Sequence, residues 1–362
     1  MKRAVLCVSR PWEIISNYEK DYSLMIVNPS VSDQRLKYLL DNSDYSLLIT
    51  EDGIVSRDGN DYPGEKVYWY TSGTTGDSKF FGFSSEQLQI MSKTICDTYD
   101  ITDNDRYFGI MPLWHGHGQG FYWAMKYAGC ETGFGTLANK DQIASFQPTF
   151  VTSIPDFMKS IQKLDLKCLR FVRTASQSLP SSLYQSLKDR FGVPVIEAFG
   201  MTEALSHCFT NPLHGEQRIG TVGLPSGIEF RIDNQQHLWI RGPATFYSDW
   251  FDTGDLAEQD DRGYVRILGR SIDRINVKGY KIDPLSIENQ LYNQFEDIKE
   301  VAVFGRDRLK CVYVGDVDLH KVSAFLVTLG TACRPKLLQQ IDEIPKNTVG
   351  KISRSLLDQH FS

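Results

Sequence analysis

The segment whose residue types best suit ligand binding is a loop of hydroxyls, glycines and one lysine, which reads YTSGTTGDSK at residues 70–79. It follows a strand pattern and precedes a helical pattern. Glycine lets a backbone approach a ligand closely, N–H groups and hydroxyls donate hydrogen bonds, and lysine adds a mobile positive charge. These properties suit a polyphosphate, although no Gly-Lys-Ser/Thr closes the loop as in a Walker motif. The candidate phosphate-binding residues are Thr71, Ser72, Gly73, Thr74, Thr75, Gly76 and Lys79.

A second candidate site is the sequence FGMTE at residues 199–203, which ends a strand pattern. Ligands bind at the carboxyl ends of strands in α/β sheets. The ring of Phe199 could stack on a base, while Thr202 and Glu203 could hold phosphate oxygens and Mg²⁺. We expect a nucleotide-binding turn at this strand end.

Two further motifs are common turn sequences when taken alone. Residues 253–255 read TGD, and Arg270 follows a glycine. A carboxylate such as Asp255 can accept from both hydroxyls of a ribose, and an arginine fork can join it. Lys351 lies in a glycine-containing turn near the C-terminus, where a lysine is normally a solvated charge.

The elements that must position these residues alternate between strand and helix. Leucines and a phenylalanine at helical spacing predict a helix over residues 181–191, and Leu88, Met91 and Ile95 predict another. The alternation favours an α/β fold with much parallel sheet. Buried strands are predicted at residues 45–50, 66–70, 150–154 and 195–199.

The predicted pattern of secondary structure changes twice towards the C-terminus. From about residue 215, short strands separated by turn residues predict a β-rich unit. The last ninety or so residues read as a small α+β domain. We therefore predict an N-terminal core over residues 1–269, with its β-rich part at about 215–269, a hinge at 270–272, and a small mobile C-terminal domain over 273–362.

Composition excludes several classes of protein. The chain has 362 residues, 41% hydrophobic and 23% charged, with a net charge of −6, which argues against a nucleic-acid or anionic-membrane binder. No apolar run is long enough to span a membrane, and the N-terminal apolar run is too short for a signal peptide. Seven scattered cysteines without a CxxC pair indicate neither a zinc site nor a disulfide framework. We expect a cytoplasmic protein.

In this order and spacing, the four motifs resemble the adenylate-forming superfamily of acyl-CoA synthetases, peptide-synthetase adenylation domains and luciferases. The resemblance runs from about residue 26 to residue 356. It implies an enzyme that joins a carboxylic acid to ATP, releases pyrophosphate, and passes the acyl group from the acyl-AMP to a thiol. ATP and Mg²⁺ would be required.

The resemblance implies that the loop of residues 71–76 and Lys79 surrounds the β- and γ-phosphates. Phe199 would stack on adenine, at a position where the family usually has tyrosine. Asp255 would bind the ribose hydroxyls, with Arg270 beside it. The implied nucleotide-binding set is Thr71, Ser72, Gly73, Thr74, Thr75, Gly76, Lys79, Phe199, Gly200, Thr202, Asp255 and Arg270.

The same resemblance implies that Thr202 contacts the α-phosphate, Glu203 holds Mg²⁺, and Lys351 bridges the carboxylate and the α-phosphate. Two anions must meet there, and a lysine beside Mg²⁺ offsets their repulsion. The implied catalytic set is Lys351, Thr202, Glu203 and His115.

The sequence PLWHGHG at residues 112–118 is similar to a stretch of 4-coumarate and fatty-acid CoA ligases. It lacks the aspartate that amino-acid-activating domains use for the ammonium group, so an amino-acid substrate is disfavoured. His115 would sit at the pocket mouth. We interpret His117 as a structural turn residue.

Residues 169–180 and 197–213 look most like the oxalate–CoA ligase branch, in which a serine and a histidine line a small polar pocket. The matching positions are Ser176 and His207, and the implied substrate residues are His115, Ser176, Met201 and His207. A small polar or aryl acid is predicted. The alternatives are a medium-chain fatty acid and an inactive nucleotide-binding regulatory subunit.

Four features depart from the family pattern. Ser78 replaces the usual proline, and Asp252 stands where an arginine is usual. The usual hinge residue, Asp or Lys, aligns with Ile272, with Asp273 one residue later. The N-terminal subdomain is reduced, so we expect compensation by a homodimer interface or by a remodelled N-terminal segment.

The acceptor thiol stays open between CoA and the phosphopantetheine of an acyl carrier protein. CoA recognition needs a place for the 3′-phospho-ADP, and no basic cluster in the sequence clearly supplies one. This slightly favours the carrier protein. In the thioester-forming pose, residues 278–281 would face the site, where Gly279 allows a pantetheine arm to pass closely.

Overall fold

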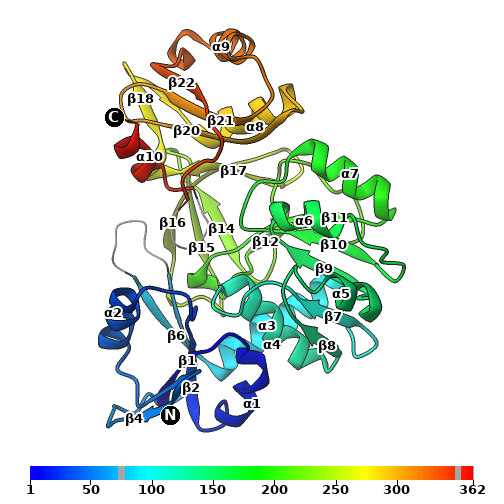
Figure 1. Ribbon diagram of the computed structural model, residues 1–362, viewed down its shortest axis with the longest axis vertical. Helices are drawn as coiled ribbons and strands as arrows, with labels where there is room; N and C mark the ends of the chain where they lie inside the picture. Colours follow the sequence, from blue (N-terminus) through cyan, green and yellow to red (C-terminus); the bar gives the residue numbers. More distant parts are fainter. Residues whose placement is uncertain (72–77, 347–351, 362) are drawn as a thin grey trace.

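The computed structural model describes residues 1–71, 78–346 and 352–361, whose strands form five sheets (Figure 1). The N-terminal sheet has the order β4-β3-β1-β2-β5-β6, with β1 parallel to both of its neighbours. Its strands are β1 (Lys2–Cys7), β2 (Tyr22–Ile26), β3 (Leu47–Thr50), β4 (Gly53–Ser56), β5 (Glu65–Tyr70) and β6 (Phe80–Ser84). The connecting helices are η1 (Pro11–Glu13), α1 (Ile15–Tyr18) and α2 (Asp33–Ser43).

Strand β1 is the apolar run that is too short for a signal peptide. Ala4, Val5 and Leu6 are completely buried, since helices and neighbouring strands cover both faces of the sheet. The N-terminal segment is therefore packed into the core. This fits the prediction that a remodelled N-terminal segment compensates for the reduced subdomain. A homodimer stays a prediction.

The second sheet has the order β13-β12-β11-β10-β9-β7-β8 and is parallel from β11 to β8. Its strands are β7 (Arg106–Gly109), β8 (Glu131–Phe134), β9 (Phe150–Ser153), β10 (Phe171–Thr174), β11 (Val195–Phe199), β12 (Phe209–Thr210) and β13 (Leu224–Pro225). The helices associated with it are α3 (Ser85–Tyr99), α4 (Gly116–Ala128), α5 (Lys140–Phe146), α6 (Pro155–Ile161) and α7 (Ser181–Phe191). The predicted α/β class with much parallel sheet is confirmed.

Helix α3 shows how the local sequence sets an element. Ser84 and Gln87 form a reciprocal capping box, and Asp100 ends the helix in the left-handed conformation. The predicted apolar positions Leu88, Met91 and Ile95 are all buried. Each such side chain contributes about 1.5–3 kcal/mol relative to leaving it exposed.

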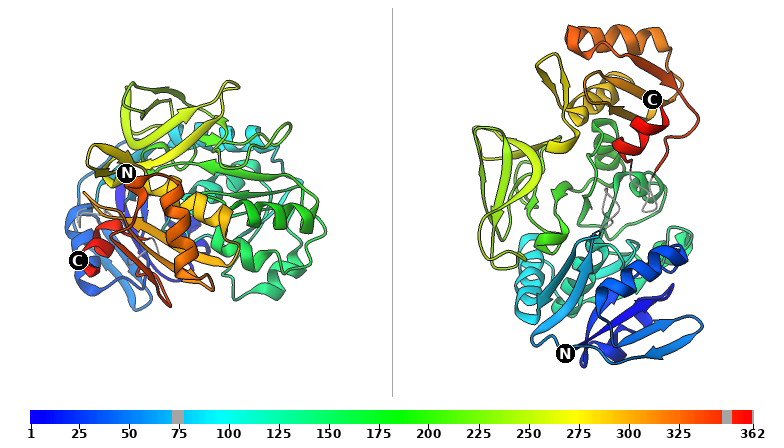
Figure 2. Two further views of the ribbon diagram at one scale, coloured as in Figure 1. Left: turned by 90° about the horizontal axis from the view of Figure 1, so that it is seen from above. Right: turned by 90° about the vertical axis from the view of Figure 1, so that its left-hand side faces the viewer.

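The third sheet is antiparallel and lies to one side of the molecule in the right-hand view of Figure 2, where it is drawn in yellow-green. Its strands are β14 (Glu229–Ile232), β15 (His237–Arg241), β16 (Phe251–Gln259) and β17 (Val265–Arg270), and the 3₁₀ turn η2 (Thr202–Ala204) precedes it in the chain. This is the β-rich unit that the turn pattern predicts.

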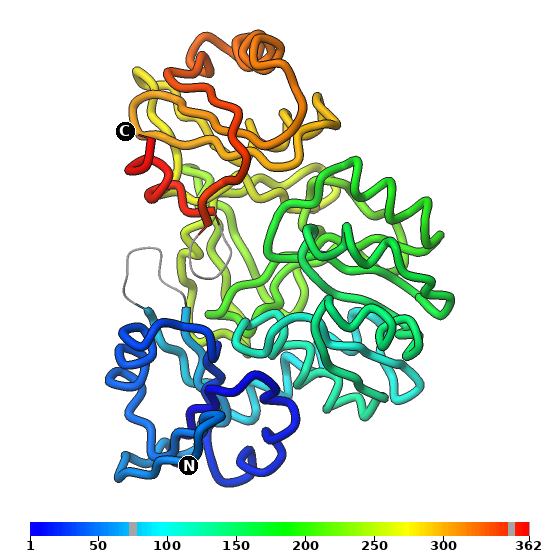
Figure 3. Tube along the Cα trace, in the orientation of Figure 1, coloured from blue at the N-terminus to red at the C-terminus, as the bar shows by residue number. Residues whose placement is uncertain are grey.

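The C-terminal residues form a hairpin and a three-stranded sheet, drawn in gold to red at the top of Figure 3. The strands are β18 (Ile275–Val277), β19 (Tyr280–Ile282), β20 (Ile298–Phe304), β21 (Lys310–Gly315) and β22 (Leu337–Gln340). The helices are η3 (Ser271–Asp273), α8 (Pro284–Gln294), α9 (Leu319–Thr328), η4 (Thr331–Cys333) and α10 (Arg354–His360). An α+β composition is observed, while the boundaries and the mobility of a C-terminal domain stay predictions.

One expectation about the hydroxyl-rich loop was wrong. The loop connects the antiparallel strands β5 and β6, and the helix α3 follows only after β6. Phe80–Ser84 is short and continues directly into the helical pattern, so the strand was missed. Among the described residues, no helix is both long and apolar enough to cross a bilayer.

Candidate active site

The turn after β11 carries the FGMTE motif and folds back on itself. A Cβ atom at Gly200 would lie 2.1 Å from the Ser206 carbonyl oxygen, so a side chain there would displace the backbone. Leu205 and Ser206 have φ angles of 49° and 66°, in the left-handed region. Such strained backbone is characteristic of functional turns. Phe199 is half-buried at the end of β11, where it pairs with Phe209 of β12, and Glu203 is half-exposed in η2.

Asp255 and Arg270 meet on the adjacent strands β16 and β17. Arg270 Nε lies 3.2 Å from Asp255 Oδ1, and Arg270 Nη1 donates to the Thr253 carbonyl at 2.9 Å. Asp255 is 4% exposed, and its Oδ2 is buried without a hydrogen-bond partner among the described residues. A buried carboxylate oxygen without a donor is costly unless a ligand supplies one.

Burial raises the pKa of Asp255 to about 6. The Arg270 guanidinium opposes this rise, whereas the carboxylates of Glu203 and Asp252 add to it. Glu203 is thus close enough to Asp255 to repel it electrostatically. The structure thus brings the two carboxylates near one another, and their nucleotide-binding roles stay predictions.

The described ends of the hydroxyl-rich loop form a closed neck. Thr71 N–H donates to the Lys79 carbonyl at 2.9 Å, and Lys79 N–H donates to Thr71 Oγ1 at 3.2 Å. The Ser78 hydroxyl donates to the Thr71 carbonyl at 2.5 Å and accepts from Arg35. The serine that replaces the usual proline thus ties the neck to α2. The predicted loop residues Ser72, Gly73, Thr74, Thr75 and Gly76 lie outside the described residues.

Phe246 connects this neck to the FGMTE turn. Its N–H donates to the Glu203 carbonyl at 2.8 Å, and its ring packs edge-on against Phe81 of β6 at 5.0 Å between centroids. Phe81 is two residues from Lys79, which is exposed. The structure therefore brings the neck and Glu203 to the same region.

Asp252, the second departure from the family pattern, stabilises the turn before Asp255. Its Oδ1 accepts from Gly254 N–H at 2.8 Å, and its Oδ2 lies 2.8 Å from His237 Nδ1. The aspartate therefore has a structural role that an arginine could not fill.

Ser176 lies beside the same turn. In the parallel pairing of β10 and β11, Thr174 is opposite Glu197, so Ser176 is level with Phe199. Ser176 is exposed and has a φ of 73°. The strand end thus presents its hydroxyl side chain from a strained backbone position next to the nucleotide-binding motif.

The amino end of α4 packs against the far side of the turn. His115 is the N-cap residue of α4 and is half-buried. A Cβ atom at Gly116 would lie 2.1 Å from Ser206 Oγ, which shows how closely the helix approaches the turn. His115 and Met201 are therefore near one another in the fold, on either side of the Gly116–Ser206 contact.

The interpretation of His117 as a turn residue was wrong. It lies in the first turn of α4, is 8% exposed, and its Nε2 lies 2.7 Å from Thr152 Oγ1 and 3.2 Å from Arg173 Nη1. The glycines on either side of it hid the helical pattern.

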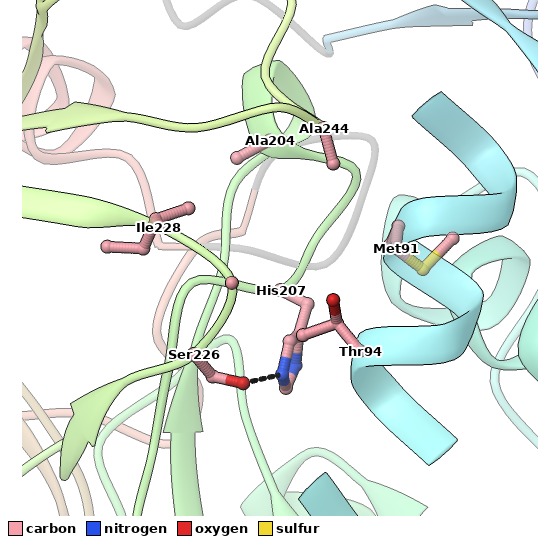
Figure 4. Close-up of a pocket in the computed structure, with 8 residues that line it drawn as sticks. Met91, Thr94, Ala204, His207, Ser226, Ile228 and Ala244 are labelled. Atoms are coloured by element: carbon pink, nitrogen blue, oxygen red, sulfur yellow. Dashed lines mark hydrogen bonds between the residues drawn. The ribbon is translucent and has the colours of Figure 1, made fainter. Parts of the chain in front are cut away.

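His207 is buried beside Ser226 and helix α3. It is 4% exposed, its Nε2 lies 2.8 Å from Ser226 Oγ, and both residues line a small pocket beside Met91 and Thr94 of α3 (Figure 4). Burial lowers its pKa to about 3, with a further contribution from the Arg173 charge. His207 is therefore neutral at physiological pH, and its place in an acid pocket stays a prediction.

The predicted hinge is followed by two ion pairs. Ile272 is 81% exposed, whereas Asp273 Oδ2 lies 3.2 Å from Arg354 Nη1. Arg274 pairs with Asp283 and also donates to Gln236 in the β14–β15 turn at 3.0 Å. These contacts tie the segment after the predicted hinge to Arg354 near the C-terminus and to Gln236 in the β14–β15 turn. Lys351 lies outside the described residues.

Mg²⁺ fits this site as an ion that bridges protein and nucleotide. Within residues 1–71, 78–346 and 352–361, no three His, Cys, Asp or Glu side chains gather as a metal site. Mg²⁺ is commonly held by one or two carboxylates together with substrate phosphates. Glu203, which lies near the loop neck, can supply one such carboxylate.

Sequence reasoning missed two residues that the structure places beside the predicted ones. Ser206, and not His207, contacts the amino end of α4. Arg173 is a charged residue within a strand that is otherwise apolar or uncharged and is fully buried. A charge in the middle of a buried strand is a sequence signal that could have singled it out.

A family model described as AMP-binding enzyme matches residues 65–247, just over half of the chain. The chain belongs to the AMP-binding enzyme family. The matched range contains the hydroxyl-rich loop and the FGMTE turn. The predicted membership of the adenylate-forming superfamily is thus confirmed.

Relatives and solved structures extend the match beyond that range. This AMP-binding enzyme is 28% identical to an oxalate–CoA ligase of Arabidopsis thaliana over 82% of its own chain and 67% of that protein, about two thirds of its length. It is 26% identical to a 2-succinylbenzoate–CoA ligase of Lactococcus lactis over 99% and 85% of the two chains. The predicted class of acid–thiol ligase is confirmed at the level of the family.

The fold is similar to that of ATP-bound MatB from Rhodopseudomonas palustris, with a TM-score of 0.88 and 22% identity over 99% of this chain and 88% of MatB. This similarity confirms the predicted fold class.

Proposed function

We propose that this AMP-binding enzyme activates a carboxylic acid with ATP, releases pyrophosphate, and transfers the acyl group from the acyl-adenylate to a thiol. The observation that carries the proposal is the buried Asp255 Oδ2, which lacks a donor although it lies beside Arg270 and within electrostatic reach of Glu203. A ribose hydroxyl supplies the missing donor. The family match independently indicates an adenosine nucleotide.

The remaining residues of the site have roles that follow from their places. Phe199 stacks on the adenine, and Gly200 keeps the turn tight enough for the base to approach. Thr202 binds the α-phosphate, and Glu203 supplies a carboxylate for Mg²⁺, which neutralises phosphate charge when bound. Lys79 and the hydroxyl-rich loop hold the outer phosphates.

The acid lies between the strand ends and the amino end of α4. In this proposal His115, Ser176 and Met201 surround the acid, which is supported by the place of His115 at the N-cap of α4 and of Ser176 level with Phe199. Lys351, outside the described residues, would bridge the carboxylate and the α-phosphate as the mixed anhydride forms. A lysine aimed at developing charge lowers the barrier without reorganising solvent.

CoA is the acceptor favoured by the comparisons, since the relatives named above are CoA ligases. Those names also support a small polar acid rather than a fatty acid, because oxalate and 2-succinylbenzoate both carry two carboxylates. A carrier-protein acceptor, a homodimer and a cytoplasmic location stay predictions from the sequence.

The acceptor is tested by supplying ATP, Mg²⁺ and an acid that supports adenylation, and then either CoA or a holo acyl carrier protein. The product is read by mass spectrometry as the acyl-thioester. We expect acyl-CoA to form faster than acyl-carrier protein at equal acceptor concentration. Faster loading of the carrier protein would instead show that the carrier protein is the acceptor. No thioester with either acceptor would contradict thioester formation. An apo carrier lacking phosphopantetheine is the matched control.

A further inference from the structure

Arg173 lies in β10, and its guanidinium contacts Tyr99, Thr152 and His117. The residue is 1% exposed. Nε donates to the Tyr99 hydroxyl at 2.7 Å, and Nη1 lies 3.0 Å from Thr152 Oγ1 and 3.2 Å from His117 Nε2. Among the described residues, no carboxylate forms an ion pair with it, and none accepts a hydrogen bond from Nη2. The buried cation thus has no carboxylate counter-ion among the described residues.

A buried charge without a counter-ion is unusual, because removing it from water is costly unless an opposite charge compensates. Two other arginines that are wholly or partly buried do have carboxylate partners. Arg3 lies 2.8 Å from Glu65, and Arg354 lies 2.8 Å from Glu288. Rings of Tyr99 and Phe121 near the Arg173 guanidinium, at 5.7 and 5.0 Å, replace only part of an ion pair.

The place of Arg173 in the fold connects it to the proposed acid site. It is three residues before Ser176 on the strand end, and its partner His117 is two residues after His115 in the first turn of α4. The glycines at 116 and 118 let α4 approach the Ser206 turn and the Pro112 carbonyl closely. Arg173 and His117 therefore lie close in the chain to Ser176 and His115, the residues proposed to surround the acid.

Further polar atoms in this region are unsatisfied. Thr174 Oγ1 and His207 Nδ1 are buried without a hydrogen-bond partner among the described residues. The Arg173 charge acts on His207 electrostatically, so the two side chains are close. A polar ligand atom in this region could use the unpartnered Thr174 hydroxyl and His207 ring nitrogen, and among the described residues no carboxylate pairs with Arg173 there.

We propose that Arg173, supported by His117, recognises a second anionic group on the substrate, so that the enzyme activates one carboxylate of a small dicarboxylic acid while the other faces the guanidinium. This inference rests on the proposed acid-activating function and names the class of acid. Binding replaces the His117–Arg173 contact by a charge-assisted hydrogen bond and supplies the counter-ion that is absent among the described residues. Arg173 is thus a specificity-determining residue, distinct from the groups that hold the nucleotide.

The test compares matched pairs of acids in ATP–pyrophosphate exchange. Malonate is compared with propionate and succinate with butyrate, so that each pair differs by a second carboxylate. We expect the wild-type enzyme to prefer one of the dicarboxylates by about 100-fold or more in kcat/KM, since a missing charge-assisted partner typically costs that much. Arg173→Met should abolish this preference mainly by lowering kcat/KM for the dicarboxylate, and Arg173→Lys should restore part of it.

Arg241→Met is the matched control, because Arg241 is a surface residue of β15 paired with Glu229 and its loss should leave the preference unchanged. If Arg173→Met fails to fold, the role of Arg173 is still tested by two measurements. These are the dicarboxylate preference of the wild-type enzyme and the effect of His117→Gln on it. His117→Gln should reduce the dicarboxylate preference by about tenfold, the effect of losing one hydrogen bond.

Two outcomes overturn the inference in distinguishable ways. Exchange with monocarboxylic acids that equals or exceeds exchange with every matched dicarboxylate would refute the role of Arg173 and leave the proposed function standing. Nucleotide binding without exchange for any acid would refute both. A dicarboxylate preference that survives Arg173→Met in a folded variant would show that other residues read the second carboxylate.

Discussion

Replacing Asp255 by asparagine should stabilise the free protein and weaken its binding of nucleotide. Asp255 is almost fully buried, and its pKa is raised from 3.8 to about 6. A raised pKa means that the fold disfavours the ionised carboxylate. The shift is about two pKa units, and each unit corresponds to about 1.4 kcal/mol, so the ionised side chain costs the folded state about 3 kcal/mol. Asparagine has nearly the same shape and carries no charge.

The sign of the pH dependence follows from the two pKa values. Below pH 3.8 the carboxyl is protonated in both states, so the variant and the wild type should differ little in their free energy of unfolding. Between pH 3.8 and about 6 the folded state binds more protons than the unfolded state, and the wild type loses stability as the pH rises. Above pH 6 the advantage of the variant should be constant.

The assay is urea unfolding of both proteins at several pH values between 4 and 8, without nucleotide. Glu258→Gln is the matched control, since Glu258 is an exposed carboxylate on the same strand β16. AMP should then stabilise the wild type much more than Asp255→Asn, because the asparagine lacks the charge that strengthens hydrogen bonds to the ribose hydroxyls. An Asp255→Asn protein that is no more stable than the wild type at pH 8, or that binds AMP equally well, would refute the reasoning.

Three other variants test separate parts of the site. Gly200→Ala places a Cβ atom 2.1 Å from the Ser206 carbonyl oxygen, so we expect a loss of about 1–3 kcal/mol in thermal unfolding and a loss of ATP binding; unchanged binding would contradict the tight turn. Arg354→Met leaves Glu288 buried without its partner and should destabilise the protein by about 3–5 kcal/mol in urea unfolding, whereas a stability equal to the wild type would show that the ion pair is dispensable. Lys351→Ala should lower acyl-adenylate formation by about 10²–10³-fold in a hydroxamate assay while the unfolding midpoint stays the same; unchanged turnover would contradict its role as the charge-bridging residue.

Elements with a clear period were predictable because their local sequence and their burial agree. The predicted helix over residues 181–191 coincides with α7, and the predicted strand over residues 195–199 coincides with β11. Motif positions were also readable, because turn residues such as Gly200 are required by backbone geometry. The resemblance implied one nucleotide site for Glu203 and Asp255, which stays a prediction, and the structure places the two carboxylates within electrostatic reach of one another.

Other features depend on contacts between distant residues, which a local pattern does not contain. β1 looked like an isolated apolar run because its partners, β2 and β3, lie about 20 and 45 residues further along the chain. The raised pKa of Asp255 arises from burial and from Glu203, fifty-two residues away in sequence. A charge within an apolar strand could have singled out Arg173, but its lack of a carboxylate partner among the described residues is known only from the fold.

The central claim, that this AMP-binding enzyme makes an acyl-adenylate from a carboxylic acid, is tested most directly by ATP–pyrophosphate exchange across small diacids, aryl acids and fatty acids. Labelled pyrophosphate enters ATP only when the adenylate forms reversibly. We predict exchange that requires both Mg²⁺ and a carboxylic acid, with a small dicarboxylic acid giving the highest rate. Measurable ATP binding without exchange for any acid in the panel would contradict the account and would favour a nucleotide-binding regulatory protein.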